Sequence, residues 1–364
     1  MRKKGFTLIE LLVVIAIIAM LLAILMPALN KVKRLAQRLV CGTSVKGLGT
    51  AMMVYAQDFE DEYPMQGGAG GHRWSNVGRT YEWYNPDKSW DDPPDKFITV
   101  AASLYLLVRV ADVDPKSFVC RSGDETAFKG VGGTANLDIV ELWDFGGETI
   151  DTTLPSGGTI TYNEGLPGKH VSYAYQLPYA YNTNGPAGRA HPASATASAS
   201  TAILADKNPW QDPKLTDGQN SDSAQKKTNY MMLVDWLGVP EDTTSGIDWT
   251  DPGDPLRDST TAWQIQIANS QAHGREGQNV LFGDGHCSFE KRSDVSYQND
   301  NIYTMFNNTA GPPSYNEYDR RTGTNRAGNT PAVIPTSAGE IGSFPRTDED
   351  TLLVNDDSRY PPLH

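Results

Sequence analysis

The chain has 364 residues, enough for one large or two modest soluble domains. It contains 44 Asp plus Glu against 31 Lys plus Arg, which gives a formal net charge of −13. Such an acidic surface repels phosphate backbones, so the composition argues against a nucleic-acid-binding protein.

The run at residues 6–29 is apolar or uncharged at every position except Glu10, and it follows three basic residues at positions 2–4 and Gly5. A helix of this length spans about 36 Å, which exceeds the roughly 30 Å of a hydrocarbon core. The run is longer than the apolar region of a secretory signal, and no small-x-small cleavage site follows it. We therefore expect a transmembrane helix over residues 6–29.

Glu10 is the one acid inside this apolar run. A carboxylate within a membrane helix costs about 2.5–3.5 kcal/mol on insertion scales, so it marks a function and needs a partner. The simpler interpretation is an anchor that tolerates one acid near its edge.

The stretch Gly5-Phe6-Thr7-Leu8-Ile9-Glu10, after its short basic leader, resembles the processing site of type IV prepilins and type II secretion pseudopilins. The resemblance implies that residues 1–5 are a leader, and that a prepilin peptidase cuts after Gly5 and methylates Phe6. It also implies that Glu10 pairs with the N-terminal amine of a neighbouring subunit during assembly. A buried ion pair tolerates burial better than either charge alone.

The same resemblance predicts location and partners. It implies a single-pass inner-membrane protein with a cytoplasmic N-terminus and a periplasmic globular domain, which reaches a filament or the cell surface after assembly. The implied partners are the peptidase and other pilin-like subunits, in a homo- or hetero-filament. Basic residues at both ends of the helix leave its orientation undecided by charge alone. Whether the subunit is major or minor, and what it secretes or binds, stays open.

A helical apolar pattern continues beyond the membrane run and predicts an amphipathic extension over residues 30–60. Its apolar positions are Val32, Leu35, Leu39, Leu48, Met52, Tyr55 and Phe59. We expect Pro27 to kink the helix, Gly42, Gly47 and Gly49 to weaken its middle, and the helix to end near Phe59, before Pro64.

Residues 61–308 are predicted to form the globular domain, and residues 309–364 a loop-rich tail. The patterns indicate a helix at 98–110, either hairpins or an inserted loop within 130–165, and strands at 114–120, 171–181, 202–205 and 351–354. Strands outnumber helices after residue 115. The predicted fold class is therefore α+β, with a long N-terminal helical spine packed on a mainly antiparallel sheet.

The segment at 65–96 is rich in glycine and aromatic residues, including Trp74, Trp83 and Trp90. Such rings either stack on sugars or pack a loop onto the core. The sugar-binding alternative gives a second candidate function, a membrane-anchored extracytoplasmic protein that captures polysaccharide.

A second motif lies between His273 and Glu290. Residues 279–282 and 286–289 read as two strands joined by Gly-Asp-Gly, a strong hairpin signal. The stretch resembles a C-terminal segment of prepilin-like proteins from the planctomycete and lentisphaera lineages, in which nine residues separate a histidine from an Asp-Gly. Here ten residues separate His273 from Asp284.

His273, Asp284, His286 and Glu290 are residue types found in hydrolase and divalent-metal sites. We treat His273, Asp284 and His286 as weak metal candidates. Asp284 lies in a tight turn, where an aspartate more often caps backbone amides than binds a metal. The sequence contains no Gly-x-Ser-x-Gly or His-Glu-x-x-His motif, so an anchored metallohydrolase is the least favoured alternative. We expect no enzyme and no cofactor; calcium is a further candidate ion, without named ligands.

The three cysteines, Cys41, Cys120 and Cys287, form no C-x-x-C pair, which leaves zinc-ribbon and thioredoxin-type sites without support. One disulfide with a spare thiol and three buried thiols are equally compatible with the sequence. The sequence does not select a pair.

Overall fold

A computed structural model describes the following parts of the chain: residues 8–66, 73–74, 97–130, 132–133, 138–146, 152–153, 159–161, 167–176, 178, 193–209, 269–293, 295–296, 302–303 and 351–355. The predicted processing residues Gly5 and Phe6 lie outside these ranges, as do most of the tryptophan-rich segment and most of the predicted tail.

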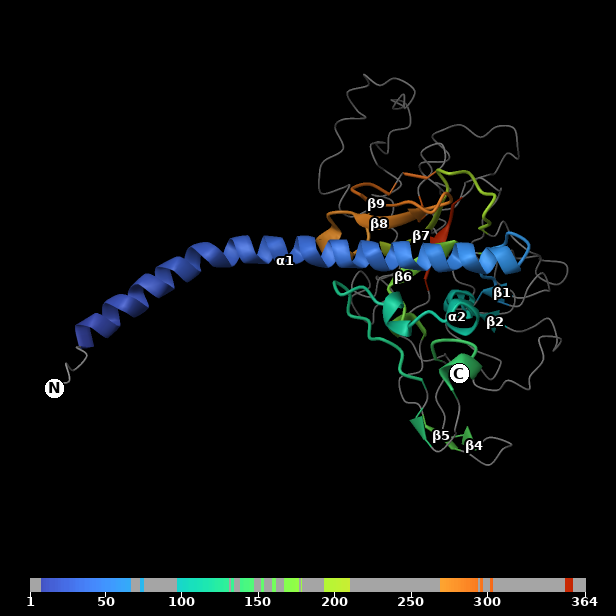
Figure 1. Ribbon diagram of the computed structural model, residues 1–364, viewed down its shortest axis with the longest axis horizontal. Coiled ribbons are helices and arrows are strands. Elements are labelled where there is room, and N and C mark those ends of the chain that lie inside the picture. Colours follow the sequence, from blue (N-terminus) through green and yellow to red (C-terminus); the bar gives the residue numbers. More distant parts are fainter. Residues whose placement is uncertain are drawn as a thin grey trace, which may run out of the picture.

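The N-terminal helix α1 (Leu8–Asp58) is continuous over 51 residues, which at 1.5 Å per residue corresponds to about 76 Å. It continues through Pro27 and curves within its N-terminal half, while its C-terminal half lies across the globular body (Figure 1). The proline removes one backbone hydrogen bond, and a gentle curve relieves the clash of its ring with the preceding turn. The helix ends one residue before Phe59, as predicted, and Glu60 and Asp61 then adopt positive φ angles of 53° and 63°.

The globular body is built on a five-stranded sheet in the order β10-β6-β7-β8-β9, in which every neighbouring pair is antiparallel. The strands are β6 (Tyr173–Gln176), β7 (Ala202–Asp206), β8 (Gln278–Phe282), β9 (Cys287–Glu290) and β10 (Leu353–Val354). Helix α1 and the shorter helix α2 (Val100–Val110) pack on this sheet (Figure 1). The predicted α+β class, with a helical spine on an antiparallel sheet, is confirmed.

Smaller elements surround this sheet. The predicted hairpins appear as a three-stranded antiparallel sheet of β3 (Gly132–Gly133), β5 (Thr159–Thr161) and β4 (Thr152–Thr153). The strands β1 (Arg73–Trp74) and β2 (Phe97–Ile98) form a parallel pair. Short 3-10 helices occur at η2 (Ile139–Glu141), η3 (Pro167–Lys169) and η6 (Ala272–Arg275).

The strand predicted at 114–120 is wrong. This segment contains the 3-10 helix η1 (Pro115–Phe118), and the Asp114 side chain accepts a hydrogen bond of 2.9 Å from the Lys116 backbone N–H. Proline in the first helical position already has the helical φ angle, and the aspartate satisfies a free backbone donor. This local capping outweighs the short apolar pattern that suggested a strand.

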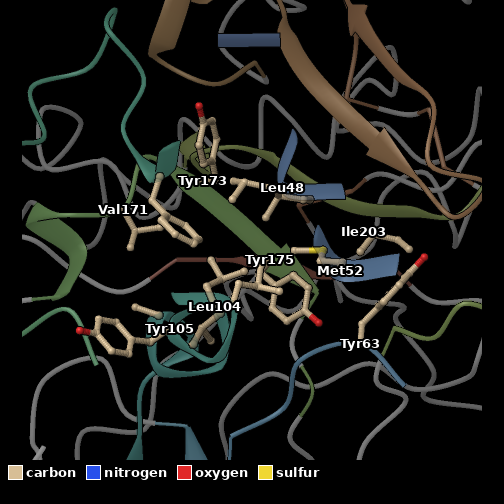
Figure 2. Packing of buried hydrophobic residues seen from close by; sticks show 14 of the residues in the cluster. Leu48, Met52, Tyr63, Leu104, Tyr105, Val171, Tyr173, Tyr175 and Ile203 are labelled. Atoms are coloured by element: carbon tan, nitrogen blue, oxygen red, sulfur yellow. The ribbon is translucent and has the colours of Figure 1, made fainter. Parts of the chain in front are cut away.

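The core lies mainly between the sheet and the two helices. Figure 2 shows Leu48 and Met52 of α1, Leu104 and Tyr105 of α2, and Tyr173 and Tyr175 of β6 converging in one buried cluster. The intervening strand residues, such as Ala174 and Val280, point to the other face, where Ile302 and Tyr303 cover them. This alternation follows from the two-residue period of a strand.

Only part of the predicted apolar stripe of α1 is buried. Leu48, Met52 and Tyr55 are buried as expected, but Val32, Leu35, Leu39 and Phe59 are 61%, 52%, 64% and 40% exposed. The buried face consists of Cys41, Val45, Leu48, Gly49, Met52, Tyr55 and Ala56. The prediction was wrong for Val32, Leu35 and Leu39, which precede Cys41, the first buried residue of the helix, and for Phe59, which follows its last residue.

Two glycines of α1 allow the helix to approach β8 closely. A Cβ atom on Gly49 would lie 2.5 Å from Cδ1 of Leu281, and one on Gly42 would lie 3.0 Å from Oδ1 of Asn279. These positions were expected only to weaken the helix. Their structural role is to bring the helix close to strand β8.

A matched pair of substitutions tests this role. A Cβ atom on Gly47 would have nothing within 4 Å, so Gly47→Ala should raise the free energy of unfolding by about 1 kcal/mol through helix propensity. Gly49→Ala should instead lower it by about 1 kcal/mol, because overpacking against buried Leu281 costs roughly 1–3 kcal/mol. Urea unfolding of the detergent-solubilised full chain measures both, and equal stabilisation by the two variants would contradict the close contact.

Candidate functional site

The N-terminal half of α1 presents an apolar surface on all sides. Every large apolar side chain from Leu8 to Leu29 is 46–77% exposed in the single chain. Within the described parts of the chain, α1 is the one helix long and apolar enough to cross a membrane. An apolar surface of this size needs lipid or other apolar helices around it.

Glu10 lies in the first turn of α1, on this exposed apolar surface. An acid in the first turn is favoured by the positive end of the helix dipole. The carboxylate is therefore presented near the N-terminal end of the helix, one turn after the predicted cleavage site.

Arg38 of α1 contacts the β8–β9 hairpin and the segment that precedes it, at the start of the globular body. Its guanidinium forms an ion pair with Glu276, and its carbon Cζ lies 3.8 Å from the centroid of the Phe289 ring. Arg34 approaches the same glutamate at 4.0 Å, while Lys31 and Lys33 are exposed. Basic side chains thus mark the point at which the helix leaves its apolar half.

The turn between β8 and β9 is held by its own side chains. Asp284 Oδ1 accepts hydrogen bonds from the His286 backbone N–H at 2.9 Å and from His286 Nδ1 at 2.5 Å. These two hydrogen bonds hold the pKa of Asp284 below its ordinary value. The His286 ring also stacks on Phe282, and Lys46 Nζ donates to the Gly285 carbonyl. The predicted capping role of Asp284 is what the geometry shows.

His273 lies near the opposite end of β8, in the buried interior. Its Nε2 atom is 3.1 Å from Asn279 Nδ2, 3.5 Å from Asp206 Oδ2 and 3.6 Å from Cys120 Sγ. The Phe289 ring covers it edge-on at 6.0 Å between centroids. The fold therefore separates His273 from Asp284 and His286, and these three candidates do not form one site.

Asp206 is the central residue of this buried cluster and was not predicted from the sequence. It is fully buried at the end of β7, and its Oδ2 accepts hydrogen bonds from the Asn279 backbone N–H at 2.7 Å and from Asn279 Nδ2 at 3.1 Å. The Tyr303 hydroxyl donates to its carbonyl oxygen at 2.8 Å. One feature of the sequence could have indicated this residue: Asp206 is an acid that directly follows the apolar residues of the predicted strand at 202–205.

Cys41 and Cys120 form a disulfide with their Cα atoms 5.2 Å apart, and Cys287 is a free, partly buried thiol. Of the two arrangements compatible with the sequence, the structure has one disulfide and a spare thiol. Burial, with a smaller contribution from the charge of Asp206, raises the pKa of Cys287 to about 11.

A cavity of about 480 Å³ opens at the C-terminal end of α1. Its lining combines aromatic rings with carboxylates and includes Tyr55, Asp58, Phe59, Glu60, Glu62 and Trp143. This lining suits sugar hydroxyls, but the tryptophan-rich segment, for which glycan binding was one of two alternatives, lies mostly outside the described residues.

Comparison with known proteins identifies the N-terminus. A family model described as the prokaryotic N-terminal methylation motif matches residues 1–26. Neither a curated protein nor a solved structure matches the chain. The prepilin-type motif is thus confirmed, and it implies processing by a prepilin peptidase and association with a membrane. The lineage-specific resemblance of the C-terminal segment stays a prediction.

The raised pKa of Cys287 predicts slow alkylation. At pH 8 a thiol of pKa about 11 is roughly one part in a thousand thiolate, about a hundredfold less than an ordinary thiol with a pKa of 9.0. Iodoacetamide should therefore modify Cys287 about a hundredfold more slowly in the folded chain than in urea. Peptide mass spectrometry of the unreduced protein follows this modification, and equal rates in both conditions would contradict the effect of burial.

Proposed function

We propose that the chain is a pilin-like subunit, processed by a prepilin peptidase between Gly5 and Phe6 and assembled into a type II secretion-like or type IV pilus-like filament. The observation that carries the proposal is the combination of the methylation motif at residues 1–26 with a helix whose first half is exposed and apolar. The mature chain then begins at Phe6 and is anchored in the inner membrane by one span, with the globular body in the periplasm.

The exposed half of α1 supports bundling with other copies. Exposing each of its large side chains to water costs about 1.5–3 kcal/mol, so the helix cannot leave the membrane alone. If apolar helices of neighbouring subunits surround it, the same side chains stay out of water as the body moves away from the membrane. Lateral packing of these helices thus provides the route from lipid to filament.

Glu10 supplies the polar contact in this packing. Cleavage after Gly5 creates an amine at Phe6, which places a positive charge in the apolar layer. Pairing of Glu10 with the amine of a neighbouring subunit neutralises both charges and sets the register of the two helices.

The proposal assigns no catalytic step to the chain. His273 lies away from the Asp284–His286 pair, and that pair is used within its own turn. The assigned role of the globular body is to present a surface to other subunits or to a transported or bound molecule.

The proposed function predicts the site of processing. In a host with a prepilin peptidase, the mature chain should begin at Phe6 and carry an N-methyl group. N-terminal mass spectrometry of the purified membrane protein measures this, with a host that lacks the peptidase as the control. An intact Met1, or a cut elsewhere, would refute the assignment.

The proposed function also predicts the effect of replacing Glu10. Glu10→Gln keeps the shape of the side chain but removes its charge, so processing should proceed while filaments are reduced at least tenfold. Leu11→Ala is the matched control, since it trims an adjacent apolar side chain and leaves the carboxylate in place. Electron microscopy counts the filaments, and normal filaments from Glu10→Gln would defeat the pairing argument. A processed wild-type chain without filaments would favour the anchored binding protein.

A further inference from the structure

Four potential ligand groups from separate parts of the chain meet in the interior. Cys41 belongs to α1, Cys120 follows η1, His273 lies in η6 and Asp206 ends β7. All four residues are buried, and the donor atoms of Cys41, Cys120 and His273 lie within 4.8 Å of one another. The fold thus collects two sulfurs and one imidazole in a single small volume, and the carboxylate of Asp206 lies beside the imidazole.

Two spacings from His273 Nε2 match the edges of a coordination tetrahedron. Zinc bonds of about 2.0–2.3 Å place neighbouring ligand atoms of a tetrahedral site roughly 3.3–3.8 Å apart. His273 Nε2 lies 3.6 Å from Cys120 Sγ and 3.5 Å from Asp206 Oδ2. Within the disulfide, the two sulfurs are covalently bonded and too close to be separate ligands.

The electrostatics of the cluster favour a bound cation. Asp206 is fully buried, and within the described residues its Oδ1 has no hydrogen-bond partner. A buried carboxylate is costly unless an opposite charge accompanies it. Asn279 orients the carboxylate through two hydrogen bonds, and such outer contacts hold metal ligands in place. Sulfur, nitrogen and oxygen donors in this combination suit zinc better than calcium or magnesium.

We propose that reduction of the Cys41–Cys120 disulfide turns this cluster into a Zn²⁺ site with Cys41, Cys120, His273 and Asp206 as ligands. A dithiol reduces the disulfide to two thiols and leaves as its own cyclic disulfide. Zinc then displaces the two thiol protons to solvent, and the two thiolates, the neutral imidazole and the carboxylate surround the ion. The metal replaces the covalent bond as the link between α1 and the segment after η1. This inference is independent of filament assembly.

The test uses the full chain in detergent. One sample stays oxidised, and the other is reduced with a dithiol that is then removed by anaerobic gel filtration. Both receive a small excess of ZnCl₂ and pass through a second gel filtration. The reduced chain should retain about one zinc and the oxidised chain almost none, as measured by atomic absorption. In addition, cobalt in place of zinc should give the absorption bands of a tetrahedral thiolate site in the reduced sample alone.

Variants locate the ligands. Cys120→Ser and Asp206→Asn should lose the retained zinc, whereas Cys287→Ser and His286→Asn should keep it, because neither residue belongs to the cluster. Circular dichroism shows which variants fold, and the comparison of oxidised with reduced wild type needs no variant. Equal zinc in the two wild-type samples, or loss of zinc in Cys287→Ser, would overturn the proposal.

Discussion

The close seating of α1 on strand β8 is the contact on which the rest of the structure depends. Gly42 and Gly49 leave room for Asn279 and Leu281, so the helix axis runs nearer to the sheet than side chains would otherwise allow. Because β8 continues into β9, the same contact positions the whole hairpin against the helix. Lys46 reaches the turn at Gly285, and Arg38 covers Phe289 near the other end of the hairpin.

The buried polar cluster determines which strands pair and in what register. Asp206 on β7 accepts both a backbone and a side-chain hydrogen bond from Asn279 on β8. A one-residue slip would turn Asn279 to the other face of the sheet and leave the carboxylate without these donors. The β7–β8 register is irregular between Ala202 and Leu204. As a result, the consecutive residues Ile203 and Leu204 both contribute to the main core. The polar contact therefore fixes the pairing where the apolar pattern alone would be ambiguous.

The features that were predictable from the sequence are those with a local cause. The apolar run, the methylation motif, the β8–β9 hairpin and helix α2 follow from composition, spacing and turn residues within a few positions of one another. The Cys41–Cys120 pair and the approach of Asp206 to His273 join residues 79 and 67 positions apart, and no local pattern encodes such contacts. The strand prediction for residues 114–120 was wrong for a different reason. A single Asp-Pro cap starts a 3-10 helix in a stretch with a strand-like composition. The exposure of Val32 and Leu35 shows that an apolar period predicts a face but not the partner that covers it.

The position of the disulfide has a mechanical consequence. Cys41 is the first buried residue of α1, and the purely noncovalent contacts of Val45, Leu48 and Met52 follow it along the helix. A tension applied to the apolar half of α1 therefore reaches a covalent bond to the body before it loads that packing. Under such a load the helix cannot be peeled from the sheet one turn at a time from its apolar end. The disulfide transfers the force to the body at Cys120. The noncovalent interface that follows Cys41 along the helix therefore does not carry that force.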